Sequence, residues 1–242
     1  MSSLPPWKRS LVELILDAHV LTFGTFTLKS GRQSPYFLDC GRFARARLAS
    51  AVAAAYARTL LAHADAHPAD FRVDVLFGPA YKGIPLAATA TVELARLDPE
   101  RWGDVGYAFN RKEAKGHGEG GTLVGEALQG KRVVVVDDVM TAGTAVREAM
   151  EVIARHGGTV VGVVVAVDRQ EKLPTTSEKE GRGDDGSELD RGSAIGELRR
   201  QTGVPVLAVL TLTDIIAGMK TTGRHEEVER MEEYYQKYGA RD

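Results

Sequence analysis

Short apolar runs alternate along the chain with longer segments of helical periodicity. The strand candidates are the runs 73–77, 105–109, 133–136, 160–167 and 204–210. Runs that are apolar throughout and rich in β-branched side chains suit strands buried on both faces of a parallel sheet. The helix candidates are 7–21, 45–67, 84–97, 146–153, 195–201, 213–220 and 226–238. Strands and helices in this order predict an α/β protein.

Two stretches depart from this alternation. Near the N-terminus, extended segments at 23–28 and 35–38 flank the turn Lys29-Ser30-Gly31-Arg32, which predicts a hairpin. Residues 172–191 are rich in Gly, Ser, Asp and Glu and contain almost no apolar residues, so we expect an exposed polar insertion. The chain has no internal repeat and no clear linker, so we expect residues 1–242 to form a single domain.

Composition narrows the classes of function. The chain is 43% hydrophobic and 26% charged, which is ordinary for a globular protein, and its net charge of -2 gives no basic field for nucleic acid or an anionic membrane. Its single cysteine excludes an internal disulfide and fits a reducing compartment. The apolar runs are too short to span a bilayer, and the first ten residues lack the apolar core of a secretory signal. We therefore expect a cytoplasmic protein with no nucleic-acid or membrane partner.

The stretch 133–145, VVVVDDVMTAGTA, carries the first candidate chemistry. Four Val residues end at the carboxylates Asp137 and Asp138, and small and hydroxyl residues then lead into a helix. Backbone N–H groups at a turn and a helix N-terminus can hold phosphate oxygens, and Thr hydroxyls add donors. The stretch predicts a socket for a sugar phosphate, with the carboxylates beside its hydroxyl groups. Alternatively, the two Asp residues only cap the next helix.

Three other segments bring positive charge to strand ends. Lys82 lies in a loop rich in Gly and Pro after the strand at 73–77, at the edge where open α/β sheets bind ligands. The glycine-rich segment 111–121 has the composition of a mobile lid. Its basic residues are Arg111, Lys112, Lys115 and His117. Arg169 follows the strand at 160–167 and could hold a ligand carboxylate through paired N–H groups. The simpler alternatives are a solvated lysine, a solvated charged face and a surface ion pair.

Five stretches in this order resemble the orotate phosphoribosyltransferases, a family of type I phosphoribosyltransferases. They are FTLKSGRQSPYF (26–37), GPAYKGIP (78–85), FNRKEAKGHGEGG (109–121), VVVVDDVMTAGTA (133–145) and VDRQE (167–171). The fourth resembles the signature for 5-phosphoribosyl 1-diphosphate (PRPP), which by itself indicates only the broad superfamily. The lid, the hairpin and the Asp-Arg-Gln segment narrow the resemblance to orotate.

The resemblance implies a fold, a reaction and an assembly. The fold is a type I phosphoribosyltransferase-like twisted, mainly parallel sheet with flanking helices and a small hood, to which residues 1–40 contribute. The reaction is that of a pentosyltransferase in pyrimidine (UMP) biosynthesis: the phosphoribosyl group of PRPP passes to orotate, giving orotidine 5′-monophosphate and diphosphate. Mg²⁺ is the implied cofactor, held mainly by substrate oxygens and water rather than by protein ligands. A homodimer that shares the lid between subunits is also implied.

Residue roles follow from the same resemblance. The implied catalytic residues are Lys115 and His117, which would assist the departure of diphosphate, and Asp137 and Asp138, which would face the ribose. The implied PRPP-binding residues are Lys29, Tyr81, Lys82, Arg111, Lys112, Lys115, His117, Asp137, Asp138, Val139, Met140, Thr141, Ala142, Gly143, Thr144 and Ala145. The implied orotate-binding residues are Lys29, Phe37, Leu38, Thr141 and Arg169. Arg169 would pair with the orotate carboxylate, and Phe37 would lie along the ring.

Two other functions stay open at this point. A purine or uracil phosphoribosyltransferase would use the same PRPP site but would not need the cations Lys29 and Arg169 for a carboxylate. A PRPP-sensing regulator of nucleic acid would need an RNA- or DNA-binding surface, and the sequence offers neither net positive charge nor an added domain for it.

Overall fold

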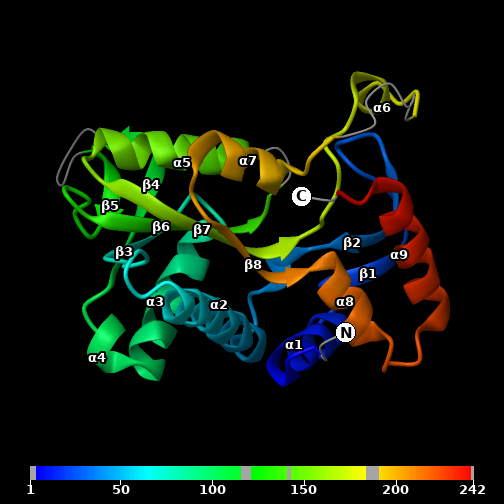
Figure 1. Ribbon diagram of the computed structural model, residues 1–242, viewed down its shortest axis with the longest axis horizontal. Helices are drawn as coiled ribbons and strands as arrows, with labels where there is room; N and C mark the ends of the chain where they lie inside the picture. Colours follow the sequence, from blue (N-terminus) through cyan, green and yellow to red (C-terminus); the bar gives the residue numbers. More distant parts are fainter. Residues whose placement is uncertain (1–3, 116–120, 141–142, 184–190, 241–242) are drawn as a thin grey trace.

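The computed structural model describes residues 4–115, 121–140, 143–183 and 191–240; the side chains of residues 114, 115 and 121 also lie outside the described part. This part forms a six-stranded sheet with helices on both faces and a separate two-stranded hairpin at one end (Figure 1). The sheet has the order β5-β4-β3-β6-β7-β8. Its strands are β3 (Val75–Gly78), β4 (Gly106–Lys115), β5 (Gly121–Gly125), β6 (Arg132–Val139), β7 (Thr159–Asp168) and β8 (Val206–Thr211).

The sheet is parallel except at one edge. Strands β4, β3, β6, β7 and β8 are parallel to their neighbours, whereas β5 pairs antiparallel with β4. The predicted mainly parallel sheet is confirmed. The sequence missed β5, and it ended β4 at residue 109, whereas the strand continues to Lys115. The segment expected to be a loop-like lid is therefore partly strand. Strand β4 continues past Phe109, where its pairing with β3 ends, so this part is not buried between two strands and does not need an apolar pattern.

The alternation of side chains along the central strands creates two hydrophobic cores. Val134 and Val136 of β6 point to the core beneath α2 (Ala46–Ala66) and α3 (Gly83–Leu97). Val133 and Val135 point to the opposite core, which α5 (Thr144–Arg155) and α7 (Ala194–Thr202) cover (Figure 1). All four Val side chains are fully buried. A run that is apolar on both faces is thus explained by helices on both faces.

The hairpin and the C-terminal helices form the other end of the molecule. Strands β1 (Leu21–Thr27) and β2 (Gln33–Leu38) are antiparallel, as predicted, and belong to a sheet of their own. The helices around the hairpin are α1 (Pro6–Asp17), α8 (Leu212–Met219) and α9 (His225–Tyr238). The Tyr36 ring of β2 meets the Tyr234 ring of α9 edge to face, with 6.0 Å between centroids. The short helices η1 (Cys40–Arg42) and α4 (Pro99–Trp102) connect elements elsewhere in the chain.

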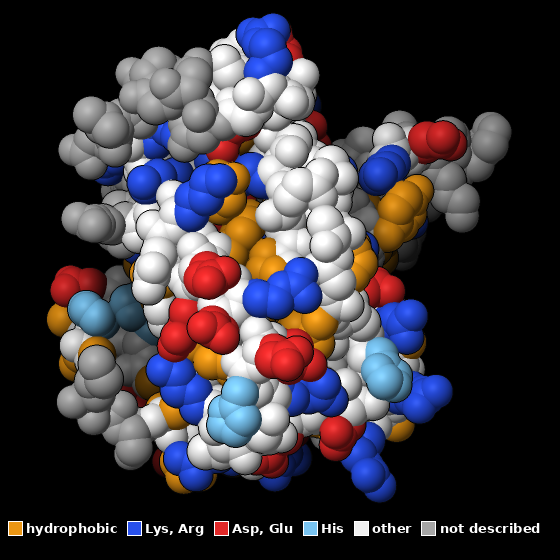
Figure 2. Space-filling model, turned by 90° about the vertical axis from the view of Figure 1, so that its right-hand side faces the viewer, with side chains coloured by type: hydrophobic (Ala, Val, Ile, Leu, Met, Phe, Trp, Pro, Cys, Tyr) orange, Lys and Arg blue, Asp and Glu red, His pale blue; other side chains and the backbone are white. Residues whose placement is uncertain are grey.

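The outer surface near α9 carries charges of both signs. Figure 2 shows acidic and basic side chains interspersed around hydrophobic ones on this side of the molecule. Two of the ion pairs there are Lys220–Glu232 and Arg224–Glu227. Within the described residues, no helix is both long enough and apolar enough to cross a membrane.

The segment 172–191 differs from its prediction. It contains a short helix, α6 (Thr176–Lys179), which begins with a capping box formed by Thr175 and Glu178. Thr175 is 5% exposed and Glu178 is 2% exposed, so the expectation of an exposed insertion is wrong for this part. The cause is a buried ion pair: Arg32, in the hairpin turn, donates to Glu178 at 2.7 and 2.8 Å. A polar segment is therefore expected to be exposed only if its charged side chains have no oppositely charged partner with which they can be buried.

Candidate active site

The carboxyl ends of three neighbouring strands place the predicted site on one edge of the sheet. Strand β6 lies between β3 and β7 and is parallel to both. The loop with Lys82 follows β3, the acidic pair lies just before the last residue of β6, and Arg169 follows β7. Parallel strands present their carboxyl ends at the same edge, where open α/β sheets bind ligands. The topology therefore gathers side chains that are far apart in sequence.

The acidic pair is held by backbone groups on both sides. An Asp137 carboxylate oxygen accepts from the Asp138 N–H at 2.9 Å, and an Asp138 oxygen accepts from the Val139 N–H at 2.7 Å. The Tyr56 hydroxyl, from α2, donates to the main-chain carbonyl of Asp137 at 2.7 Å. Burial raises the pKa of Asp137 to about 6, against the opposing effect of the Asp138 N–H. Burial thus makes the carboxyl group of Asp137 harder to ionise than usual, whereas the neighbouring carboxylate of Asp138 accepts a hydrogen bond from the Val139 N–H.

The alternative that the two Asp residues cap the next helix is wrong. The N-cap of α5 is Gly143, in the left-handed region at φ 72°, and no side chain of the described part caps this helix. The first N–H groups of a helix have no partner inside it, and its N-terminus carries partial positive charge. The start of α5 therefore keeps the properties of a phosphate-binding turn.

The loop after β3 makes contacts on two sides. Lys82 Nζ donates to Asp138 at 2.8 Å, while its side chain stays 63% exposed. This hydrogen bond raises the pKa of Lys82. On the other side, the Ala80 N–H donates to the Asn110 side chain of β4 at 3.1 Å, and Lys112 Nζ lies 4.9 Å from the centroid of the Tyr81 ring. The loop thus joins the basic strand β4 to the acidic end of β6.

The remaining PRPP candidates divide into three groups. Arg111 and Lys112 are on β4, beside the loop that contains Tyr81. The Met140 side chain is buried in a hydrophobic core and Val139 is partly buried against the other core, whereas Thr144 and Ala145 are exposed at the start of α5. The third group lies outside the described part of the chain and consists of His117, Thr141, Ala142 and the side chain of Lys115.

The orotate candidates lie on or near the hairpin. Lys29 is exposed in the turn, Phe37 is 42% exposed with its ring centroid 5.5 Å from that of Phe26, and Leu38 packs against the core. Arg169 faces the same hairpin: its guanidinium carbon lies 4.5 Å from the centroid of the Tyr36 ring. It pairs with Glu171 at 2.6 Å, and its side chain is only 12% exposed. The alternative of a surface ion pair is therefore wrong for Arg169.

Within the described residues, no group of three or more His, Cys, Asp or Glu side chains is arranged to hold a metal ion. Asp137 and Asp138 lie side by side near the end of β6, and Asp138 already accepts from Lys82. One or two carboxylates beside a phosphate site suit Mg²⁺ that keeps substrate and water ligands. These residues fit an ion that arrives with a substrate rather than one in a protein cage.

Comparisons with known proteins agree with this geometry. Residues 48–188 match the family model of the phosphoribosyl transferase domain. The chain is 51% identical to the orotate phosphoribosyltransferase of Neurospora crassa over the full length of both. The crystal structure of the orotate phosphoribosyltransferase from Francisella tularensis superposes with a TM-score of 0.75 at 36% identity, covering 96% of this chain and 100% of that one. The UMP synthase of Leishmania donovani superposes at 0.69 and 25% identity, covering 96% of this chain and 42% of that one.

The chain belongs to the orotate phosphoribosyltransferase family. The predicted type I phosphoribosyltransferase fold and the predicted enzyme class, a phosphoribosyltransferase of pyrimidine biosynthesis, are confirmed.

In this orotate phosphoribosyltransferase family member, sequence reasoning missed the residues that support the predicted site. They are Ser34, Tyr36, Tyr56, Asn110 and Glu171. Most lie far in sequence from the groups they contact, and nothing in their local pattern marks those partners. Glu171 is the exception, because a carboxylate two residues after an arginine at a strand end is itself a signal.

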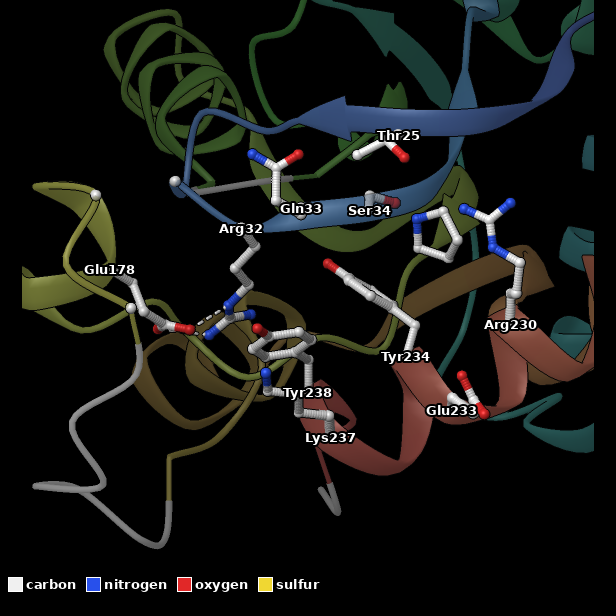
Figure 3. A pocket seen from close by; sticks show the side chains of 14 residues that line it. Thr25, Arg32, Gln33, Ser34, Glu178, Arg230, Glu233, Tyr234, Lys237 and Tyr238 are labelled. Atoms are coloured by element: carbon white, nitrogen blue, oxygen red, sulfur yellow. Dashed lines mark hydrogen bonds and ion pairs between the residues drawn. The ribbon is translucent and has the colours of Figure 1, made fainter.

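A groove of about 600 Å³ lies between the hairpin and α9, and none of the predicted site residues lines it. Figure 3 shows Ser34 and Gln33 on one side of the groove and Tyr234, Arg230 and Lys237 on the other. At one end, Arg32 and Glu178 form their buried ion pair. The groove is therefore a neighbour of the orotate candidates rather than part of the strand-edge site.

Proposed function

We propose that this chain binds PRPP at the carboxyl edge of β3 and β6 and binds orotate between that edge and the hairpin. The transfer of the phosphoribosyl group from PRPP to orotate, which yields orotidine 5′-monophosphate and diphosphate, is the reaction of its family. The observation that supports the placement best is the contact between Lys82 and Asp138. It holds a cation suited to diphosphate next to a carboxylate suited to ribose, so that one PRPP molecule could reach both side chains.

Each part of PRPP has a proposed partner. The 5′-phosphate would lie at the turn 141–144, against the N-terminus of α5, where backbone N–H groups and Thr hydroxyls are donors. The ribose hydroxyls would donate to Asp137 and Asp138. The diphosphate would meet Lys82 and the Tyr81 backbone, with Arg111, Lys112, Lys115 and His117 closing over it. Lys29 would contribute a further cation from the hairpin turn.

These residues suit the chemistry of the transfer. Breaking the bond between ribose C1 and diphosphate leaves positive charge on the sugar and negative charge on the leaving group. Cationic side chains stabilise the leaving diphosphate, and Lys115 and His117 are the proposed groups that assist its departure. Asp137 and Asp138 stabilise the sugar cation, and closure over the site keeps water from attacking it. Mg²⁺, bound through diphosphate oxygens and water, would neutralise part of the charge of the leaving group.

Orotate differs from uracil by its carboxylate, which needs a cation. Arg169 would pair with this carboxylate, Phe37 would lie along the ring, and Lys29, Leu38 and Thr141 would complete the pocket. A guanidinium suits a planar carboxylate because its N–H groups match the spacing of the two oxygens. This placement favours orotate over the alternative of uracil or a purine.

We further propose a cytoplasmic homodimer in which the lid of one subunit serves the site of the other. Residues 1–242 would act as one domain, with residues 1–40 contributing to the hood. Mixing Lys115→Ala subunits with Asp138→Asn subunits tests the sharing. Activity in the mixture well above that of either variant is expected, because some hybrid sites would receive an intact lid and an intact acidic pair. A mixture no more active than its components would contradict the sharing.

The orotate assignment is tested by steady-state kinetics of Arg169→Ala, followed by the loss of orotate absorbance with PRPP and Mg²⁺. We expect the KM for orotate to rise by on the order of a hundredfold while the KM for PRPP stays within about twofold, because a lost charge-assisted pair weakens one substrate only. Arg101→Ala is the matched control, since Arg101 forms an exposed ion pair with Asp65. An unchanged KM for orotate would remove Arg169 from the site.

A further inference from the structure

Arg169 is fixed along one edge of its guanidinium. Its Nε donates to Glu171 Oε1 at 2.8 Å, and its Nη2 lies 2.6 Å from the same oxygen. Nη2 also donates to the Ser34 hydroxyl at 3.3 Å. The Tyr36 ring covers one face of the group. Within the described residues Nη1 makes no hydrogen bond, so the end of the guanidinium opposite the chain keeps donors for another partner.

Glu171 is in turn held on two sides. Its second oxygen lies 3.8 Å from Arg32 Nη1, in the hairpin turn. Its backbone forms an antiparallel bridge with Gly239, and the neighbouring Gln170 carbonyl accepts from the Ala240 N–H at 2.8 Å. The Gln170 side chain accepts from the Thr213 N–H and from its hydroxyl, both at 3.0 Å. With its side chain 15% exposed, Glu171 cannot move away from Arg169 without breaking several contacts.

We propose that Glu171 is a positioning residue for substrate specificity: it holds the Nε–Nη2 edge of Arg169 and so presents the Nη1 end to the carboxylate of the pyrimidine. The inference rests on the proposed role of Arg169. A long arginine side chain has many rotamers, and fixing it before the ligand arrives removes that ordering from the cost of binding. A preset guanidinium also offers its Nη1 donors in one fixed direction, which favours a ligand with a carboxylate, such as orotate, over uracil, which has none.

The opposite role for Glu171 would be competition. A carboxylate that occupied the substrate end of Arg169 would have to be displaced by orotate, and its removal would improve binding. The geometry disfavours this role, because Glu171 takes the edge nearest the chain and leaves the far end available. The two roles predict opposite changes in the kinetics of variants at position 171.

The test measures kcat/KM for orotate in Glu171→Ala, Glu171→Gln, Arg169→Ala and the double variant. Glu171→Ala is expected to lower kcat/KM for orotate roughly tenfold to a hundredfold, the scale of a misplaced binding group, while the KM for PRPP stays within about twofold. Glu171→Gln keeps an acceptor for the Arg169 edge and should recover part of the loss, since hydrogen bonds to a neutral acceptor are about half as strong. In the Arg169→Ala background, Glu171→Ala is expected to have no further effect.

Three results would overturn the proposal. They are an unchanged kcat/KM in Glu171→Ala, a lower KM for orotate in that variant, and an equal loss in the presence and absence of Arg169. The last would mean that Glu171 acts through Arg32 and the hairpin. If Arg169→Ala alone leaves orotate kinetics unchanged, the proposed role of Arg169 fails and the positioning role of Glu171 fails with it, whereas a loss in Arg169→Ala without a loss in Glu171→Ala overturns the positioning role alone. If Glu171→Ala does not unfold cooperatively and is therefore not properly folded, Glu171→Gln replaces it. The loss of kcat/KM for orotate is then compared with Arg169 present and in the Arg169→Ala background, and the same outcomes decide.

Discussion

The buried ion pair between Arg32 and Glu178 gives a stability prediction that the structure allows to be worked out. The pair is bidentate: Nε donates to one carboxylate oxygen at 2.7 Å and Nη2 to the other at 2.8 Å. The two side chains are 1% and 2% exposed. The change is Glu178→Gln, which keeps the size of the side chain and an acceptor for the capping box of α6, but removes the negative charge.

Two estimates of the loss agree. Removing one partner of a buried pair leaves the other charge uncompensated and costs about 3–5 kcal/mol. Independently, burial raises the pKa of Glu178, but hydrogen bonds from Arg32, the Thr175 N–H and Arg191 outweigh it and lower the pKa to about 2. Compared with an ordinary glutamate pKa of about 4.3, this difference corresponds to about 3 kcal/mol in favour of the folded state. We expect Glu178→Gln to lose about 3 kcal/mol.

The assay is urea unfolding at pH 7 and at lower pH, followed by circular dichroism. Because the folded pKa lies below the unfolded one, the stabilisation by Glu178 is complete above about pH 4.3 and disappears as the pH falls toward about 2. The difference between wild type and Glu178→Gln should shrink over that range. A control replaces Glu178 and both arginines that pair with it, Arg32→Met, Arg191→Met and Glu178→Met, and should lose less than the sum of the three single variants because it leaves no charge of this cluster buried without a partner. A loss below about 1 kcal/mol for Glu178→Gln at pH 7, the scale of a surface pair, would refute the reasoning.

Two other predictions concern the hairpin turn and the acidic pair. Gly31→Ala should lower the melting temperature far more than Gly203→Ala. Both glycines have positive φ, a conformation that costs a residue with a side chain about 1–2 kcal/mol. In addition, a Cβ on Gly31 would lie 1.8 Å from the Glu178 carbonyl oxygen, whereas one on Gly203 would meet nothing within 4 Å. Equal losses would contradict the docking of the turn on α6. Asp137→Asn should raise the free energy of unfolding, measured by urea unfolding, by about 2–3 kcal/mol more at pH 8 than at pH 4. The reason is that Asp137 has a pKa of about 6 in the folded protein, above its value in the unfolded chain, so its ionisation destabilises the fold as the pH rises. A gain in stability that does not depend on pH would contradict this reasoning.

Local pattern was sufficient for most elements of the fold. The run 133–136 is apolar at every position, and a strand buried on both faces needs such a run. The sequence placed the end of this strand at Asp137, but the strand continues through Asp137 and Asp138 to Val139 because β7 pairs with it there. The edge strand β5 escaped detection because its five residues, GTLVG, begin and end with glycine and hold only two apolar residues, too few to show a strand pattern.

The environment of the predicted site residues could not be read from the sequence in the same way. The signature 133–145 indicated a ribose-phosphate socket, and the flanking motifs indicated its family. Nothing in those motifs indicated that Arg169 would be nearly buried beneath Tyr36, or that Lys82 would pair with Asp138. These contacts join residues more than fifty positions apart, and their partners depend on which strands lie side by side.

The sequence by itself determined the class of fold, the family and the residue types of the candidate site, because hydrophobic periodicity and short motifs are properties of neighbouring residues. The tertiary structure decided which charges are buried and what they pair with. Arg32 and Glu178 look like surface residues in a polar stretch, but they form a buried ion pair because the hairpin turn lies against α6. The physical reason is that the energy of a charge depends on its surroundings, and those surroundings are assembled from distant segments of the chain.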